Sequence, residues 1–173
     1  VIMNGKSKIS ACNAVDKVLI DKNLPNKNEF IQKLISKLKA FNIEILGDKA
    51  TCQLDDISAF ESDDIWYEEF LDYKIVIGEI VSNADAIAKI NTYSGGHSSS
   101  IITRNKDEAK LFMENVDTAA VYHNASTRFT DGGQLGLGGE LAISTDKLHQ
   151  RGPIGLQHLV TNKWYVHGNG QIR

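Results

Sequence analysis

Cys12 is the residue whose type could carry the most chemistry, and it stands between small and polar neighbours just ahead of an apolar run. A cysteine acts as a nucleophile when it is exposed and when nearby N–H groups or positive charges lower its pKa. The small side chains of Ala11 and Ala14 leave room for a substrate beside the thiol. Composition alone favours the competing interpretation, a buried structural cysteine, and Cys52 fits that interpretation as well.

A polar segment that runs into a glycine-rich loop forms the second candidate site. Five of the chain's 14 glycines lie within residues 132–139, after a segment that carries Asn124, Ser126, Thr127 and Arg128. Arg128 could anchor a carboxylate or a phosphate, because its planar guanidinium binds such groups through two hydrogen bonds. The alternative is a surface connection with Arg128 in a salt bridge. The polar side chains beside the glycines favour a site.

Several motifs of nucleotide and metal sites are absent. The run Gly136-Leu137-Gly138 would need a glycine at position 141 to complete a dinucleotide fingerprint, and Leu141 stands there. We find no Walker motif, no nucleophile elbow and no zinc-ligand spacing, so we expect no metal. Most of any nucleotide site would therefore lie outside this chain. Three histidines could act as acids or bases, although no partner follows by spacing: His97, His123 and His149.

Composition bounds the class of protein. The chain has 173 residues, 42% of them hydrophobic and 24% charged, with a net charge of -3. Lys and Arg are dispersed, which argues against a nucleic-acid partner. No apolar run is long enough to span a membrane, and the two cysteines have no disulfide or metal spacing, so we expect a cytoplasmic protein. The chain begins at Val1 without an initiator Met, which suggests a fragment or a processed product.

Apolar periodicity predicts alternating strands and helices. Strands are expected at residues 17–21, 42–47, 74–80, 98–103, 119–123, 141–144 and 164–166, and helices at residues 26–41, 83–93, 105–116 and 153–160. The acidic segment 48–69 has only weak periodicity. This alternation predicts an α/β fold with a mostly parallel sheet and flanking helices.

Residues 121–138 closely resemble the characteristic stretch of gamma-glutamyl phosphate reductase, also called glutamate-5-semialdehyde dehydrogenase, of the aldehyde dehydrogenase superfamily. Further matching segments are Ala11-Cys12-Asn13-Ala14-Val15, Glu68-Glu69-Phe70-Leu71 and Gly96-His97-Ser98-Ser99-Ser100-Ile101. The resemblance implies an aldehyde dehydrogenase-like catalytic domain over residues 1–143 and a C-terminal oligomerisation extension over residues 144–173. It also implies a homo-oligomer, and a cofactor-binding domain that precedes the cysteine and is absent from this chain.

The resemblance further implies the reaction and the residues that perform it. Cys12 would attack L-glutamyl 5-phosphate and release phosphate, and NADPH would reduce the resulting thioester to L-glutamate 5-semialdehyde, a step of proline biosynthesis. Glu69 matches the position that holds the nicotinamide ribose in related dehydrogenases. The segment that contains Asn124, Ser126, Thr127 and Arg128 matches the substrate side of the tunnel.

Two other functions stay open at this point. The chain could be a non-catalytic domain or fragment of that enzyme, or an aldehyde dehydrogenase that acts on a different small-molecule substrate. The enzyme hypothesis also makes a geometric prediction, namely that Cys12 and residues 124–138 meet at one edge of the sheet.

Overall fold

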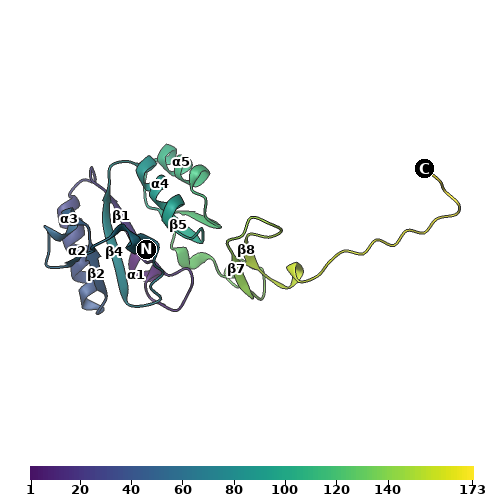
Figure 1. Cartoon of the computed structure of the whole chain (residues 1–173), viewed down its shortest axis with the longest axis horizontal. Coiled ribbons are helices and arrows are strands. Elements are labelled where there is room, and N and C mark those ends of the chain that lie inside the picture. Colours follow the sequence, from purple (N-terminus) through teal and green to yellow (C-terminus); the bar gives the residue numbers. More distant parts are fainter.

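The computed structural model describes the whole chain, residues 1–173, and its largest element is a four-stranded parallel sheet (Figure 1). The strands β1 (Lys17–Asp21), β2 (Glu44–Gly47), β3 (Ser58–Ala59) and β4 (Lys74–Ile80) lie in the spatial order β1-β4-β2-β3. Ile75, Val76 and Ile77 of β4 are all fully buried. A strand whose two faces are both covered carries such consecutive apolar residues, which explains the apolar run of β4.

Helix α2 (Lys27–Ala40) connects β1 to β2 and covers the sheet with one apolar stripe. Four side chains at helical spacing are buried, Ile31, Leu34, Ile35 and Leu38. They form one core cluster with the isoleucines of the sheet region, Ile20, Ile43, Ile45, Ile75 and Ile77. The helix predicted at residues 26–41 and the strands predicted at residues 17–21 and 74–80 are thereby confirmed.

A second parallel pair, β5 (Ser98–Ile101) and β6 (Ala120–His123), follows α4 (Asn83–Tyr93) and encloses α5 (Lys106–Asn115). Asn105 caps α5, because its Oδ1 accepts hydrogen bonds from the N–H groups of Asp107 and Glu108. The Glu108 carboxylate accepts a hydrogen bond from Asn83 Nδ2 at 2.6 Å, which connects α5 to α4. The predicted α/β fold with parallel strands and flanking helices is confirmed, and its strands divide between two sheets.

Short elements fill the connections, namely α1 (Ile2–Gly5), α3 (Lys49–Cys52) and the 3-10 turns η1 (Asp63–Trp66) and η2 (Thr127–Phe129). Trp66 of η1 packs against Gly78 of β4 so closely that a Cβ on Gly78 would lie 2.7 Å from the indole ring. Glycine is therefore required at this position of the central strand. No helix of the chain combines the length and the apolar composition that crossing a membrane requires.

The C-terminal region differs from the sequence prediction. Strands β7 (Ala142–Ser144) and β8 (Gly152–Ile154) form an antiparallel hairpin, followed by the 3-10 turn η3 (Leu156–His158). The predicted helix at residues 153–160 is wrong, because Pro153 pairs with Ile143 in the hairpin. The predicted strand at residues 164–166 is also wrong. These residues belong to an extended tail that projects from the body without a partner strand (Figure 1).

Residue 143 lies inside β7, so the predicted division at 143/144 falls within the hairpin, and the domain boundaries stay a prediction. The hairpin is tied to the α5–β6 turn by Asp117, whose carboxylate binds Lys147 and lies 2.7 Å from Arg151 Nη1. Arg151 Nη2 also donates to the Asp117 carbonyl at 3.0 Å. Hydrogen bonds from Lys147 and Arg151 hold the pKa of Asp117 below its ordinary value of 3.8.

We expect the Asp117→Asn substitution to loosen the hairpin, which amide hydrogen exchange of residues 142–154 at neutral pH would detect. Because the pKa of Asp117 is lowered on folding, the ion pairs stabilise the folded state above pH 3.8 and are lost as the pH falls through the lowered pKa. Asp107→Asn, in the same α5–β6 unit, removes an exposed carboxylate that makes no ion pair and is the control. Equal exchange rates in both variants would contradict the role of Asp117 in holding the hairpin.

Candidate active site

Hydrogen bonds to Asn13 bring the segment of Cys12 beside residues 127–130. Asn13 Nδ2 donates to the Thr130 carbonyl at 2.8 Å, and its Oδ1 accepts from Arg128 Nη1 at 2.8 Å. The Asn13 carbonyl accepts from Thr127 Oγ1 at 2.6 Å. Asn13 is only 5% exposed, so its bonds to Thr127 and Thr130 are shielded from water, and its bond to Arg128 is partly buried. The segment that carries Cys12 therefore lies against the distant loop, which is the part of the prediction that the structure confirms.

The meeting does not take place at one edge of one sheet, as the sequence suggested. Cys12 precedes the amino end of β1, whereas the loop follows the carboxyl end of β6. These strands belong to different sheets. The contact therefore joins opposite strand ends, and the site lies where the two sheets adjoin.

The two cysteines have different surroundings. Cys12 is exposed, so a buried structural role does not apply to it. Cys52 is partly buried, and its Sγ lies 3.5 Å from the Gly47 carbonyl. Burial raises the pKa of the Cys52 thiol, and the Asp48 carboxylate raises it further. A higher pKa leaves less thiolate, so Cys12 is the better candidate for a nucleophile.

Four polar residues were expected to line the substrate, and the structure gives each an internal partner. Asn124 has a left-handed φ of 55°, and its side-chain amide exchanges two hydrogen bonds with the backbone of Thr103. Ser126 Oγ accepts from the Arg128 N–H at the start of η2, and Thr127 and Arg128 hold Asn13. Their role as substrate ligands stays a prediction. Within this chain they fix the loop against the Cys12 segment.

Glu69 lies just before β4 and is exposed, and its carboxylate accepts no hydrogen bond within the chain. The backbone around it is held from the start of β1 and the residue before it, because Lys17 Nζ donates to the Glu68 carbonyl and the Phe70 N–H donates to Asp16 Oδ2 at 3.0 Å. A fixed backbone with a free carboxylate suits a residue that accepts hydrogen bonds from a ligand's hydroxyl groups.

His97 has charged neighbours that sequence spacing did not reveal. Its Nδ1 lies 2.8 Å from Ser98 Oγ, and its Nε2 is buried without a partner. Burial lowers the pKa of His97, while the carboxylates of Glu69 and Glu140 raise it. Glu140, at the end of the glycine loop, and Glu69 thus both interact electrostatically with the His97 imidazole. These two carboxylates come from two segments that are distant from His97 in the sequence, so no sequence pattern pointed to them.

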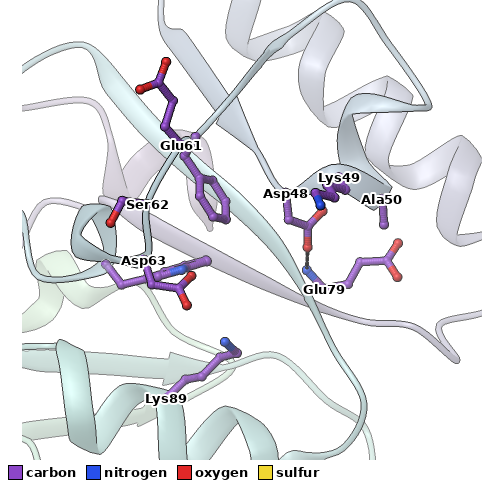
Figure 2. Close-up of a pocket in the computed structure, with 10 residues that line it drawn as sticks. Asp48, Lys49, Ala50, Glu61, Ser62, Asp63, Glu79 and Lys89 are labelled. Atoms are coloured by element: carbon purple, nitrogen blue, oxygen red, sulfur yellow. Dashed lines mark hydrogen bonds between the residues drawn. The ribbon is translucent and has the colours of Figure 1, made fainter.

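A separate cavity of about 580 Å³ lies at the other end of the large sheet (Figure 2). Its walls follow the carboxyl ends of β2, β3 and β4 and carry both signs of charge, from Asp48, Lys49, Glu61, Asp63, Glu79 and Lys89. Figure 2 shows Asp48 accepting a hydrogen bond from the Glu79 N–H, at 2.6 Å. Cys12 and Glu69 precede the amino ends of β1 and β4, so this cavity is not part of their site.

Comparison with known proteins identifies the relatives of this chain. It is 48% identical over 176 residues to the gamma-glutamyl phosphate reductase of Dictyoglomus thermophilum, which matches all of the chain and 41% of that relative. The crystal structure of gamma-glutamyl phosphate reductase from Thermotoga maritima matches the whole chain with a TM-score of 0.92 at 40% identity. The chain is a homologue of gamma-glutamyl phosphate reductase.

This gamma-glutamyl phosphate reductase homologue spans about two fifths of the length of the relatives it matches. A propionaldehyde dehydrogenase from Clostridium phytofermentans, 16% identical, matches 88% of the chain with a TM-score of 0.59. The homologue therefore has an aldehyde dehydrogenase-like fold. A scan against protein-family models finds no match.

We expect Asn13→Ala to lower the free energy of unfolding by about 2 kcal/mol, because the buried carbonyl of Thr130 and the partly buried guanidinium of Arg128 would lose their partner. Urea unfolding measures this change. The rate of Cys12 alkylation by iodoacetamide should also change, since the Cys12 segment loses its tie to the loop. Asn4→Ala, at an exposed asparagine without a side-chain hydrogen bond, is the control. A loss no larger than that of the control would contradict the role of Asn13.

Proposed function

We propose that the protein containing this chain reduces L-glutamyl 5-phosphate to L-glutamate 5-semialdehyde with NADPH and releases phosphate, in proline biosynthesis. The observation that carries this proposal is the exposed thiol of Cys12, set beside residues 127–130 by the buried bonds of Asn13. Homology over the whole chain supports the same reaction. Since the chain spans about two fifths of its relatives, the complete activity is assigned to the longer protein.

Cys12 supplies the covalent chemistry in this proposal. Its thiolate attacks the acyl carbon of the substrate, an S–C bond forms, and the C–O bond to phosphate breaks as phosphate leaves with the electron pair. The N–H groups of Cys12 and Asn13 are not engaged in hydrogen bonds within the chain, so they are free to stabilise the oxyanion. Phosphate is a good leaving group, so the step needs no strong general acid.

Glu69 is the residue of this chain that we assign to the cofactor. Its exposed and unengaged carboxylate fits the hydroxyl groups of a ribose, and the bonds of Phe70 to Asp16 and of Glu68 to Lys17 fix its backbone. NADPH, when bound, supplies the hydride that reduces the acyl group to the aldehyde. No glycine fingerprint is present in the chain, so we assign the rest of the cofactor's contacts to the part of the longer protein outside this chain.

We further propose that residues 144–173 form an oligomerisation extension on another copy of the chain, in a cytoplasmic homo-oligomer. The tail exposes large apolar side chains that monomeric proteins usually bury, since Trp164 is 88% exposed and Val166 is 87% exposed. An extended segment also offers unpaired N–H and C=O groups to a partner strand.

The enzyme proposal predicts the outcome of substitutions at the two cysteines. We expect Cys12→Ala to abolish NADPH-dependent release of phosphate when the chain is joined to the upstream part of the Thermotoga maritima relative. Cys52→Ser should leave this turnover within about twofold of the unsubstituted protein, because that thiol has a raised pKa and lies outside the site. Activity that survives Cys12→Ala would exclude Cys12 as the nucleophile.

A non-catalytic role for this chain alone is the second candidate, because it spans only 41% of the enzyme from Dictyoglomus thermophilum. A calorimetric titration of NADPH into the isolated chain tests this role. We expect binding weaker than about 1 mM, because Glu69 alone supplies too few contacts for tight binding. Micromolar binding would refute the non-catalytic role.

A further inference from the structure

The loop that carries Cys12 is closed at its base by a buried ion pair. Lys6 Nζ lies 2.9 Å from Asp16 Oδ1, and the Lys6 side chain is 0% exposed. Beside this pair, the Val15 N–H donates to the Gly5 carbonyl at 3.0 Å. A fully buried ammonium group requires a charged partner, since an unpaired charge in the interior is strongly destabilising. The bond between Lys6 and Asp16 therefore holds the two ends of the Cys12 loop together.

The second oxygen of Asp16 reaches a different part of the site. Asp16 Oδ2 accepts the hydrogen bond from the N–H of Phe70, the residue directly after Glu69. The Phe70 ring is further held by two ammonium groups, Lys17 Nζ at 4.4 Å and Lys74 Nζ at 5.0 Å from its centroid. One carboxylate thus joins the base of the nucleophile loop to the segment that presents Glu69.

We propose that Asp16 is a positioning residue that sets the Cys12 loop relative to Glu69. This inference rests on the proposed function, in which Cys12 attacks the substrate and Glu69 faces the cofactor. Asp16 touches neither, and it acts through Lys6 on one side and Phe70 on the other. Hydride transfer needs the acyl group and the nicotinamide at a fixed separation, so the spacing of these two segments bears directly on the rate.

Two oxygens are needed for this link. An asparagine at position 16 has a single acceptor oxygen, and its amide NH₂ can only donate. If that oxygen faces Lys6, the NH₂ group opposes the Phe70 N–H, and the second link is lost. If Lys6 is also replaced by methionine, the oxygen is free to turn to Phe70 and restore the bond.

The test uses the whole chain in a Cys52→Ser background and compares Asp16→Asn, Lys6→Met and the double variant. The rate of amide hydrogen exchange at Phe70, measured by NMR, reports the bond between Asp16 and the Phe70 N–H next to Glu69. The rate of Cys12 alkylation reports whether the ion pair between Lys6 and Asp16 still holds the ends of the Cys12 loop together. Asp21→Asn, which removes an exposed carboxylate at the other end of β1, is the control.

In Asp16→Asn, we expect exchange at Phe70 to become about tenfold faster, which corresponds to the loss of one hydrogen bond. In Lys6→Met and in the double variant, exchange at Phe70 should stay near that of the unsubstituted chain. Alkylation of Cys12 should change in all three variants, and Asp21→Asn should change neither measurement.

The inference is overturned if Asp16→Asn leaves both measurements unchanged. It is also overturned if exchange at Phe70 in the double variant is as fast as in Asp16→Asn, because that result indicates a general loss of packing. Should Asp16→Asn fail to fold, Lys6→Met decides: changed alkylation with protected Phe70 supports the link, and unchanged alkylation overturns it.

A functional measurement separates this inference from the proposed function. In the chain joined to the upstream part of the Thermotoga maritima relative, Asp16→Asn should raise KM for NADPH by about tenfold, as the loss of one contact to a positioned group predicts. An unchanged KM overturns the role of Asp16 in cofactor positioning. If the unsubstituted joined protein reduces no substrate, the proposed function fails, while exchange and alkylation still decide the link.

Discussion

A buried polar side chain needs hydrogen-bond partners, and Asn13 finds partners for its Nδ2, its Oδ1 and its backbone carbonyl in one short segment of the chain. Thr127, Arg128 and Thr130 supply these partners from more than a hundred positions away. Leaving any of these groups unpaired in the interior would cost free energy, so the Cys12 segment and the polar loop are held in one arrangement. The candidate site exists because this arrangement is enforced, and not because its residues are close in sequence.

The polar residues of the site fall into two classes. Asn124, Ser126 and Thr127 have their side chains engaged within the chain, which makes them part of the framework. The thiol of Cys12 and the carboxylate of Glu69 are exposed and unengaged. A site that binds ligands needs groups of both kinds, because free groups act well only when rigid neighbours hold them in place. The structure thus leaves the Cys12 thiol and the Glu69 carboxylate without partners inside the chain, and the role of the loop residues as substrate ligands stays a prediction.

Sequence patterns predicted the elements in which local and tertiary preferences agree. The stripe of α2 and the apolar run of β4 identified buried surfaces that the structure contains at those residues. The helix predicted after Gly152 was wrong, because a short apolar run fits a helix or a strand equally well. Its pairing with β7 determines that it is a strand. The bonds of Asn13 and Asp16 could not be predicted from spacing, since they join segments that are brought together only by the fold. The sequence predicted that the loop approaches the Cys12 segment, but it did not identify Asn13 as the residue that holds the two together.

The order of strands in the large sheet has a consequence for how the chain folds during synthesis. Strand β4 lies between β1 and β2, so β1 has no neighbour in its sheet until residues 74–80 have been made. Pairing of β1 with β4 closes a long loop, which is slow because the entropy of closure is lost before the strands interact. A ribosome-bound chain that ends before residue 74 therefore exposes the apolar faces of β1 and α2 together. Exposed apolar surface of this kind is prone to aggregate, and β4 covers it when residues 74–80 have been made.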